Sequence, residues 1–289
     1  MSQTFNTVPS IGLENVVNGN KEPRSMSDQF DDSTLGTLYS VKRSDVPRHA
    51  LAAAGPALES IHYFVDGKRF TGYYVHPLES AMFPGVVVAH EAMGVNEHVK
   101  ARAQALAEAG YAAFVLDLYG ESFPFPELAD RHMGLMSEPG LIFKRAKAAL
   151  EVLASQDAVD PSRLGAVGFC QGGITALELA RGGLVRCAVG FHPGLESPKG
   201  SPEGRMSAKI LMLIGDDDPM IPLDHRFQFA EEMRRRDAAW ELHVFGGVGH
   251  AYTNPGVDRI GRPGFAYSAY ADKRSWRMML DLLDEELKS

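Results

Sequence analysis

Short apolar runs alternate along the chain with longer stretches of mixed polarity, starting near residue 60. Continuous apolar runs of this length are typical of strands that are buried on both faces of a parallel sheet. They occupy residues 85–89, 112–116, 163–169, 187–191 and 210–214. Apolar residues with the period of a helix occupy residues 99–109, 143–154, 174–181, 226–236 and 268–287. This alternation predicts an α/β fold, with a mostly parallel central sheet and helices on both faces.

The part of the chain before this alternation has two other patterns. Residues 61–75 read as two strands joined by Asp66-Gly67, which predicts a tight hairpin. Residues 1 to about 30 are rich in Ser, Asn, Asp and Gly and show no period. We therefore expect a flexible N-terminal extension at residues 1–45 and one α/β domain at residues 46–289. The extension is a candidate for contacts between the subunits of a homo-oligomer.

Composition narrows the class of protein. Of 289 residues, 45% are hydrophobic and 23% are charged, as in ordinary globular proteins. The net charge of −8 offers no basic surface for nucleic acid. No run approaches the roughly 18 apolar residues that a membrane span needs, and the first 25 residues are too polar for a secretory signal. We expect a cytoplasmic protein that binds neither nucleic acid nor membrane.

The candidate chemistry begins at residues 168–173, which read Gly-Phe-Cys-Gln-Gly-Gly. This is the spacing of a strand-to-helix nucleophile elbow, with Cys170 where serine is usual. The apolar run before it and the helical period after it supply the strand and helix that the motif requires. The alternative interpretation is a buried cysteine among packing glycines, which is how we interpret Cys187. The two cysteines form no CxxC or His-rich pattern, so we expect no disulfide, metal or cofactor.

Two later loops offer an acid and a base. In open α/β sheets the chemistry gathers at the carboxyl ends of the strands. Asp216, Asp217 and Asp218 follow one predicted strand, and His250 lies in a glycine-rich loop after a later one. The order nucleophile, acid, histidine is that of α/β-hydrolase triads, in which the acid orients the imidazole and the imidazole activates the nucleophile. Three adjacent aspartates leave the identity of the acid open.

An early loop adds a carboxylate to this set. Residues 90–96 read His-Glu-Ala-Met-Gly-Val-Asn and follow a predicted strand, so Glu91 would point into the same site. With this loop, the cysteine elbow, an aspartate four residues before Pro222 and the Gly249-His250 pair, the chain resembles the dienelactone hydrolase family of α/β-hydrolases. The resemblance covers roughly residues 60–287.

The resemblance implies a catalytic mechanism. Cys170, Asp218 and His250 would form a triad that hydrolyses a carboxylic ester or lactone through an acyl-thioester, and the family pattern favours Asp218 over Asp216. Glu91 would take part in activating the cysteine. In the family the resting thiol contacts the glutamate, and substrate displaces the carboxylate so that a thiolate forms beside the imidazolium.

The resemblance also assigns residues that contact the substrate. The backbone N–H groups of Gln171 and Ala92 would stabilise the oxyanion. Candidates for substrate binding are Tyr119, Phe123, Arg131, Tyr252 and Asn254. The namesake enzymes hold the carboxylate of an acidic lactone with arginines, one of them four residues after the catalytic histidine. This chain has Asn254 there, which argues against dienelactone itself as substrate.

Two functions of different class are compatible with these residues. The first is a cysteine-dependent hydrolase of a small ester or lactone. The second is a non-catalytic ligand-binding or thiol-sensing protein on an α/β-hydrolase scaffold, because a protonated cysteine beside a carboxylate is a weak nucleophile. The ordered set of Glu91, Cys170, Asp218 and His250 favours the hydrolase. The natural substrate is not specified by these residues.

Overall fold

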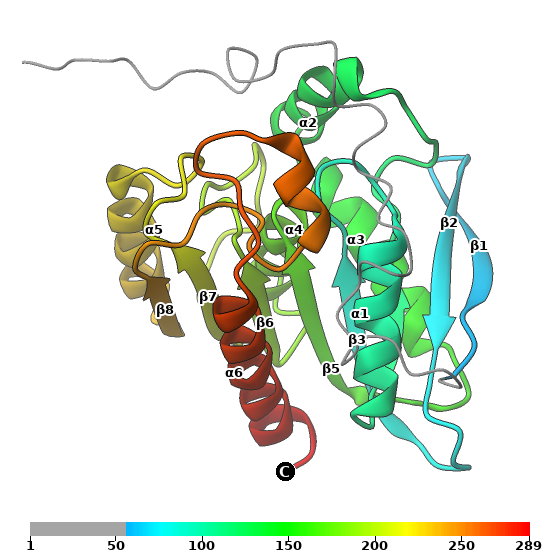
Figure 1. Ribbon diagram of the computed structural model, residues 1–289. Helices are drawn as coiled ribbons and strands as arrows, with labels where there is room; N and C mark the ends of the chain where they lie inside the picture. Colours follow the sequence, from blue (N-terminus) through cyan, green and yellow to red (C-terminus); the bar gives the residue numbers. More distant parts are fainter. Residues whose placement is uncertain (1–55) are drawn as a thin grey trace, which may run out of the picture. The chain divides into compact units, whose positions relative to one another are not determined.

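The computed structural model describes residues 56–289. The extension expected at residues 1–45 lies outside them. Eight strands form one sheet in the order β1-β2-β4-β3-β5-β6-β7-β8, as Figure 1 shows. The hairpin β1-β2 is antiparallel and joins β4 in antiparallel fashion, and all other neighbours are parallel. The strands are β1 (Glu59–Val65), β2 (Lys68–Val75), β3 (Phe83–Ala89), β4 (Ala112–Val115), β5 (Val159–Phe169), β6 (Cys187–Phe191), β7 (Lys209–Gly215) and β8 (Ala239–Phe245).

Helices cover both faces of the sheet, and each face has its own apolar core. On one face α1 and α6 pack over the strands, and on the other α3, α4 and α5 do so (Figure 1). α2 lies at the end of the sheet where the parallel strands finish (Figure 1). The helices are α1 (Glu97–Glu108), α2 (Leu128–Ser137), α3 (Leu141–Ala154), α4 (Gln171–Arg181), α5 (Leu223–Arg235) and α6 (Ala269–Leu287), with 3-10 turns η4 (Phe125–Glu127) and η5 (Pro255–Ile260).

The predicted architecture is confirmed, and the differences have local causes. The hairpin turns at Asp66-Gly67, both with positive φ, as a tight two-residue turn requires. α2 was not among the predicted helices, because only Leu128 and Leu135 of its ten residues are buried and they make a weak period. α4 starts three residues earlier than its apolar period suggests, since packing overrides the low helix propensity of Gly172 and Gly173.

The glycines of the elbow are required by close backbone contacts. Cys170 lies between β5 and α4 and has φ 53° and ψ −114°, a left-handed conformation that residues other than glycine rarely adopt. A Cβ atom at Gly168 would lie 1.8 Å from the carbonyl oxygen of Gly172, and one at Gly172 would lie 2.1 Å from that of Ala89. The first turn of α4 therefore packs directly against the ends of β5 and β3.

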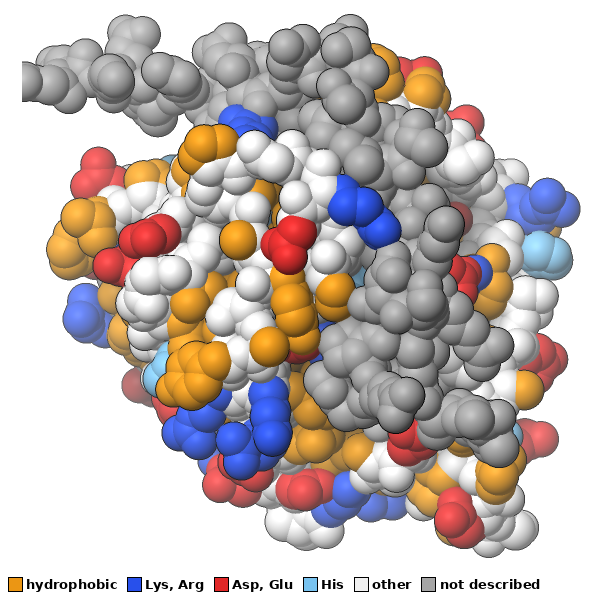
Figure 2. Space-filling view, in the orientation of Figure 1, with side chains coloured by type: hydrophobic (Ala, Val, Ile, Leu, Met, Phe, Trp, Pro, Cys, Tyr) orange, Lys and Arg blue, Asp and Glu red, His pale blue; other side chains and the backbone are white. Residues whose placement is uncertain are grey.

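Acidic and basic side chains are interspersed over the described part of the face seen in Figure 2. None of the helices within residues 56–289 has the length and apolar character needed to cross a membrane.

We expect Gly172→Ala to destabilise the protein strongly. Its new methyl group would lie 2.1 Å from the Ala89 carbonyl oxygen, and relief requires β3 or α4 to move. The expected loss is at least about 3 kcal/mol, with a fall in Tm of about 6 °C or more. Thermal unfolding followed by circular dichroism measures it.

Gly134→Ala is the matched control. Gly134 lies inside α2, and a Cβ atom there would have no neighbour within 4 Å. The substitution should leave stability unchanged or raise it by about 0.5–1 kcal/mol. Equal melting temperatures for the two variants would contradict the close-contact account of the elbow.

Candidate active site

Three of the predicted catalytic residues meet at the carboxyl end of the sheet. The Nε2 atom of His250 lies 3.3 Å from the sulfur of Cys170, and its Nδ1 atom lies 2.8 Å from Oδ2 of Asp218. The other carboxylate oxygen of Asp218 accepts the backbone N–H of Met220 at 2.8 Å. Because an ionised carboxylate only accepts hydrogen bonds, Nδ1 of His250 carries a proton and Nε2 faces the sulfur.

The geometry separates the three adjacent aspartates. Asp218 is buried, whereas Asp216 and Asp217 are exposed. Asp216 pairs with the guanidinium of Arg226 at 2.7 Å. Asp218 is thus the one that contacts His250, which is the choice that the family pattern favoured.

The ring of His250 is held on two sides by aromatic contacts. The rings of His192 and Phe265 each meet it edge-on at 5.2 Å between centroids. Its backbone N–H donates to the carbonyl of Gly264 at 2.6 Å. His192 and Ala251 adopt positive φ, as Cys170 does. Strained backbone of this kind persists where the surrounding structure fixes it, and it gathers here around the candidate catalytic atoms.

Electrostatics shift the pKa values of the two adjacent imidazoles, His250 and His192, in opposite directions. Burial lowers the pKa of His250, but the Asp218 carboxylate and the Cys170 sulfur more than offset burial and hold that pKa well above its ordinary value. Burial, together with the nearby charge on His250, lowers the pKa of His192 well below its ordinary value. A protonated imidazole beside Cys170 stabilises a thiolate.

Glu91 lies in the site but contacts other partners than the resemblance implies. Its Oε2 atom accepts a hydrogen bond from Nδ2 of Asn254 at 2.9 Å and lies 3.8 Å from Nδ1 of His98. Burial raises the pKa of Glu91, against the opposing effect of Asn254 and His250. Within the described residues the hydrogen bond of the Cys170 sulfur runs to His250. Glu91 is thus hydrogen-bonded to Asn254, and its role in activating Cys170 stays a prediction.

The loop that carries Ala92 is fixed by a buried histidine. The N–H of Leu118 donates to Nε2 of His90 at 3.1 Å, which leaves the ring proton on Nδ1, 2.6 Å from the carbonyl oxygen of Glu91. Burial lowers the pKa of His90, so its ring is neutral. Because the C=O and N–H of a trans peptide point in opposite directions, holding the Glu91 carbonyl also orients the Ala92 N–H. Gln171 is the first residue of α4, so its N–H has no acceptor within the helix.

The substrate-binding candidates lie in different environments. Tyr119 donates its hydroxyl hydrogen to the carbonyl of Ala92 at 2.9 Å, and its ring packs edge-on against Phe123. Arg131 lies over the ring of Phe123 and forms ion pairs with Glu121 and Glu127. Tyr119 and Phe123 thus form one aromatic wall beside the Ala92 loop.

The other two candidates are buried. Tyr252 is fully buried, and its hydroxyl donates to the carbonyl of Leu213 at 3.2 Å. Asn254 is 1% exposed, and its Oδ1 atom accepts the N–H of Gly256 at 2.9 Å. Their side chains thus serve contacts within the protein.

Sequence patterns did not reveal the polar residues behind the site. His98 and Arg102 are buried on α1, and Asp272 is buried on α6. The spacing of four between His98 and Arg102 indicates a shared helix face, yet no local signal indicates that this face is buried. Their contacts join segments more than 150 residues apart in the sequence.

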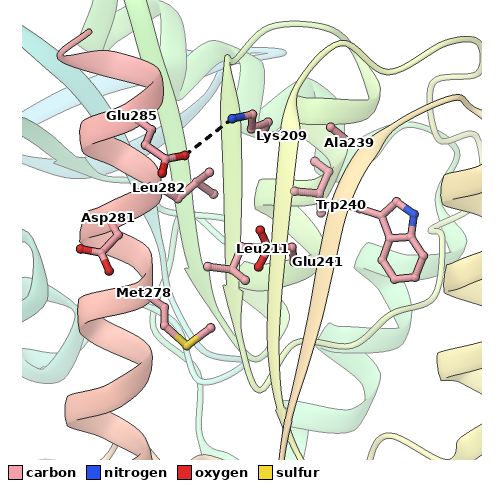
Figure 3. A pocket seen from close by; sticks show the side chains of 10 residues that line it. Lys209, Leu211, Ala239, Trp240, Glu241, Met278, Asp281, Leu282 and Glu285 are labelled. Atoms are coloured by element: carbon pink, nitrogen blue, oxygen red, sulfur yellow. Dashed lines mark ion pairs between the residues drawn. The ribbon is translucent and has the colours of Figure 1, made fainter.

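A separate groove of about 440 Å³ lies between α6 and the strands β7 and β8 (Figure 3). Lys209 and Ala239, the first residues of these two strands, line it. It therefore opens at the end of the sheet opposite to Cys170. Within the described residues, no group of three or more His, Cys, Asp and Glu side chains is arranged to bind a metal ion.

Comparison with known proteins identifies the family. A sequence profile of the dienelactone hydrolase family matches residues 70–287. The chain belongs to the dienelactone hydrolase family. The expected family is thus confirmed, and with it the α/β-hydrolase fold and the class of enzyme, a hydrolase of esters or lactones.

Individual relatives agree with this assignment. The chain is 30% identical over 228 residues to a probable 2-oxo-3-(5-oxofuran-2-ylidene)propanoate lactonase of Bradyrhizobium sp., covering 74% of this chain and 91% of the relative. It is also 30% identical to a putative carboxymethylenebutenolidase of Salmonella typhimurium, covering 75% and 83%. Among solved structures, a dienelactone hydrolase-like promiscuous phosphotriesterase from metagenomic libraries has a TM-score of 0.77 at 34% identity, covering 81% and 99%.

We expect His250 to keep its ring proton as the pH rises through 6.5, because its pKa lies well above that ordinary value. In Asp218→Asn the opposing effect of burial should dominate, and His250 should lose its proton at a lower pH than in the wild type. Titration of the ring carbon signals by NMR measures both, with the signal assigned by comparison with His250→Gln.

Asp216→Asn is the control for this titration. Asp216 is exposed and bound to Arg226, so its removal should leave the midpoint of His250 unchanged. An unchanged midpoint in Asp218→Asn, or a shift of equal size in Asp216→Asn, would contradict the assignment of Asp218.

Proposed function

We propose that this protein hydrolyses an uncharged carboxylic ester or lactone, with Cys170 as nucleophile and an acyl-thioester as intermediate. The observation that carries the proposal is the hydrogen-bonded series from the Cys170 sulfur through His250 to the buried Asp218. It stands at a strained elbow, where the nucleophile of an α/β-hydrolase belongs. Family membership favours an enzyme over the thiol-sensing alternative.

The first half of the reaction forms the thioester. The Cys170 thiolate attacks the carbonyl carbon, and the electron pair of the carbonyl moves onto its oxygen. The N–H groups of Gln171 and Ala92 are the donors that stabilise this oxyanion. When the carbonyl re-forms, the C–O bond to the alcohol breaks, and the His250 imidazolium gives its Nε2 proton to the departing oxygen.

The second half releases the acid. Neutral His250 takes a proton from water at Nε2 while the water oxygen attacks the thioester carbon. Asp218 holds the Nδ1 proton throughout and stabilises the imidazolium that forms again. Collapse of the second oxyanion breaks the C–S bond and returns the thiolate beside the imidazolium.

The partners of the arginines near Tyr119 and Phe123 support an uncharged substrate. The name of the Bradyrhizobium relative describes a lactone that carries a carboxylate, and a phosphotriester, the substrate type named for the metagenomic relative, carries no charge. In this chain the arginines near Tyr119 already have protein partners: Arg131 pairs with Glu121 and Glu127, and Arg145 donates to the Leu118 carbonyl.

The polar side chain next to the nucleophile adds no charge. Gln171 is 1% exposed and neutral.

Two features of the proposal stay predictions: the cytoplasmic location, and a homo-oligomer formed through residues 1–45.

We expect Cys170→Ala to lower kcat/KM for 4-nitrophenyl acetate by at least about 10³-fold, since the variant lacks the attacking atom. Release of nitrophenolate measures the rate. The matched control is Cys187→Ala, because Cys187 is fully buried in β6 and burial raises the pKa of its thiol to about 12. That variant should keep kcat/KM within about twofold. Turnover by Cys170→Ala at the wild-type rate would remove the proposal.

The proposed substrate class predicts a preference between two esters of similar shape. 4-Nitrophenyl butanoate and 4-nitrophenyl hydrogen succinate share a leaving group, and the terminal methyl of one is a carboxylate in the other. We expect kcat/KM to be at least about tenfold higher for butanoate, which corresponds to about 1.4 kcal/mol. A preference for the succinate ester would contradict the proposal, because it would show that a cationic side chain of this protein binds the substrate carboxylate.

A further inference from the structure

A buried polar network of Arg102, Asp272, Thr253 and His98 lies next to Glu91. Nη2 of Arg102 donates to the carbonyl of Thr253 and to Oδ1 of Asp272, both at 2.7 Å. Its Nε atom lies 3.3 Å from Nε2 of His98. The network thereby ties α1 and α6 to the loop that carries His250.

His98 links this network to Glu91. Its side chain is fully buried, and its ring meets Phe169 edge-on at 5.1 Å between centroids. Its Nδ1 atom has no hydrogen-bond partner among the described residues and lies 3.8 Å from Oε2 of Glu91. Burial, and after it the positive charge of Arg102, lowers the pKa of His98 well below its ordinary value. The ring is therefore neutral and carries one proton.

The charged neighbours assign that proton to Nδ1. Arg102 is always protonated, so its Nε–H requires an acceptor, and Nε2 of His98 provides one. In the other tautomer the proton is on Nε2 of His98, so this N–H would face the Nε–H of Arg102. The lone pair of Nδ1 would then face the Glu91 carboxylate, and both contacts would be repulsive. That tautomer would gain a bond to the Thr253 carbonyl, 3.1 Å from Nε2, but it would leave the Arg102 Nε–H without its acceptor. Interactions with charged groups outweigh one neutral bond.

We propose that His98 is a positioning residue whose Nδ1–H keeps the Glu91 carboxylate on the Asn254 side of the site, so that the Cys170 sulfur stays paired with His250 before substrate arrives. The 3.8 Å separation is too long for a hydrogen bond, and the attraction is between an N–H dipole and a buried charge. The inference rests on the proposed role of Cys170 as nucleophile. It makes the resting contact between the Cys170 sulfur and His250 independent of substrate.

Several charged or titratable groups lie around Glu91 and His98, and each of them can affect the pH dependence of Cys170 alkylation. They come from α1, the end of β6, the loop after β8, and α6, and they are Arg102, His192, His250 and Asp272, with the neutral amides of Asn96 and Asn254 beside the carboxylate. Of these, only His250 has a pKa raised well above the ordinary histidine value.

The test is the pH profile of Cys170 alkylation by iodoacetamide without substrate, followed by intact mass. His98→Leu removes the donor and frees the carboxylate to approach the sulfur. We expect its alkylation rate at pH 6 to fall about tenfold relative to wild type, as its profile moves about one unit toward alkaline pH. His98→Gln should keep the wild-type profile, because one side-chain amide can accept from Arg102 and donate to Glu91.

A double variant separates positioning from structural support. Glu91→Gln added to His98→Leu removes the carboxylate charge, so the wild-type alkylation profile should return. An unshifted profile in a folded His98→Leu variant, or a loss that Glu91→Gln does not restore, would overturn the proposal.

A second measurement needs no variant of His98. The ring nitrogen signals in the ¹⁵N NMR spectrum of the wild type should show the proton of His98 on Nδ1, and a proton on Nε2 would overturn the inference even where His98→Leu fails to fold. Alkylation measures the reactivity of the Cys170 thiol without any ester. Its result is therefore independent of the ester turnover measured with Cys170→Ala.

Discussion

The contact between the first turn of α4 and the ends of β3 and β5 determines the geometry of the site. Only hydrogen fits at Gly168 and Gly172, so three backbone segments meet at a distance that side chains would prevent. This contact forces Cys170 into a left-handed conformation. It also brings Gly172, in the first turn of α4, against the backbone of Ala89 and His90. One steric constraint thus fixes the backbone on both sides of Cys170 against the end of β3.

Four buried histidines near the site differ in pKa because their neighbours differ. His90, His98, His192 and His250 are all buried near the site, and burial alone would make each of them neutral. His250 differs because the Asp218 carboxylate contacts it, and its pKa rises while those of the other three fall. The rings of His90 and His192 form hydrogen bonds within the protein, and in the proposed mechanism the charged ring of His250 transfers protons.

Local patterns in the sequence predicted what depends on local sequence. The strands, most helices and the elbow follow from apolar periods and from glycine spacing, and the chain order of Cys170 and His250 indicated a hydrolase. Contacts between distant segments could not be predicted in this way. The bond between Asn254 and Glu91 joins residues 163 positions apart, and residue type alone does not show that Asp218 is buried while Asp216 is exposed. The family resemblance supplied the choice of aspartate, but it did not indicate the hydrogen bond between Glu91 and Asn254.

The central claim is that the Cys170 sulfur becomes covalently acylated during turnover. Acid quenching of the enzyme within milliseconds of mixing with 4-nitrophenyl acetate, followed by intact mass and peptide mapping, tests it most directly. The account predicts one added acetyl group on the peptide that contains Cys170, removed by neutral hydroxylamine as a thioester is. Turnover without any acetylated Cys170, or with the acetyl group on another residue, would contradict it.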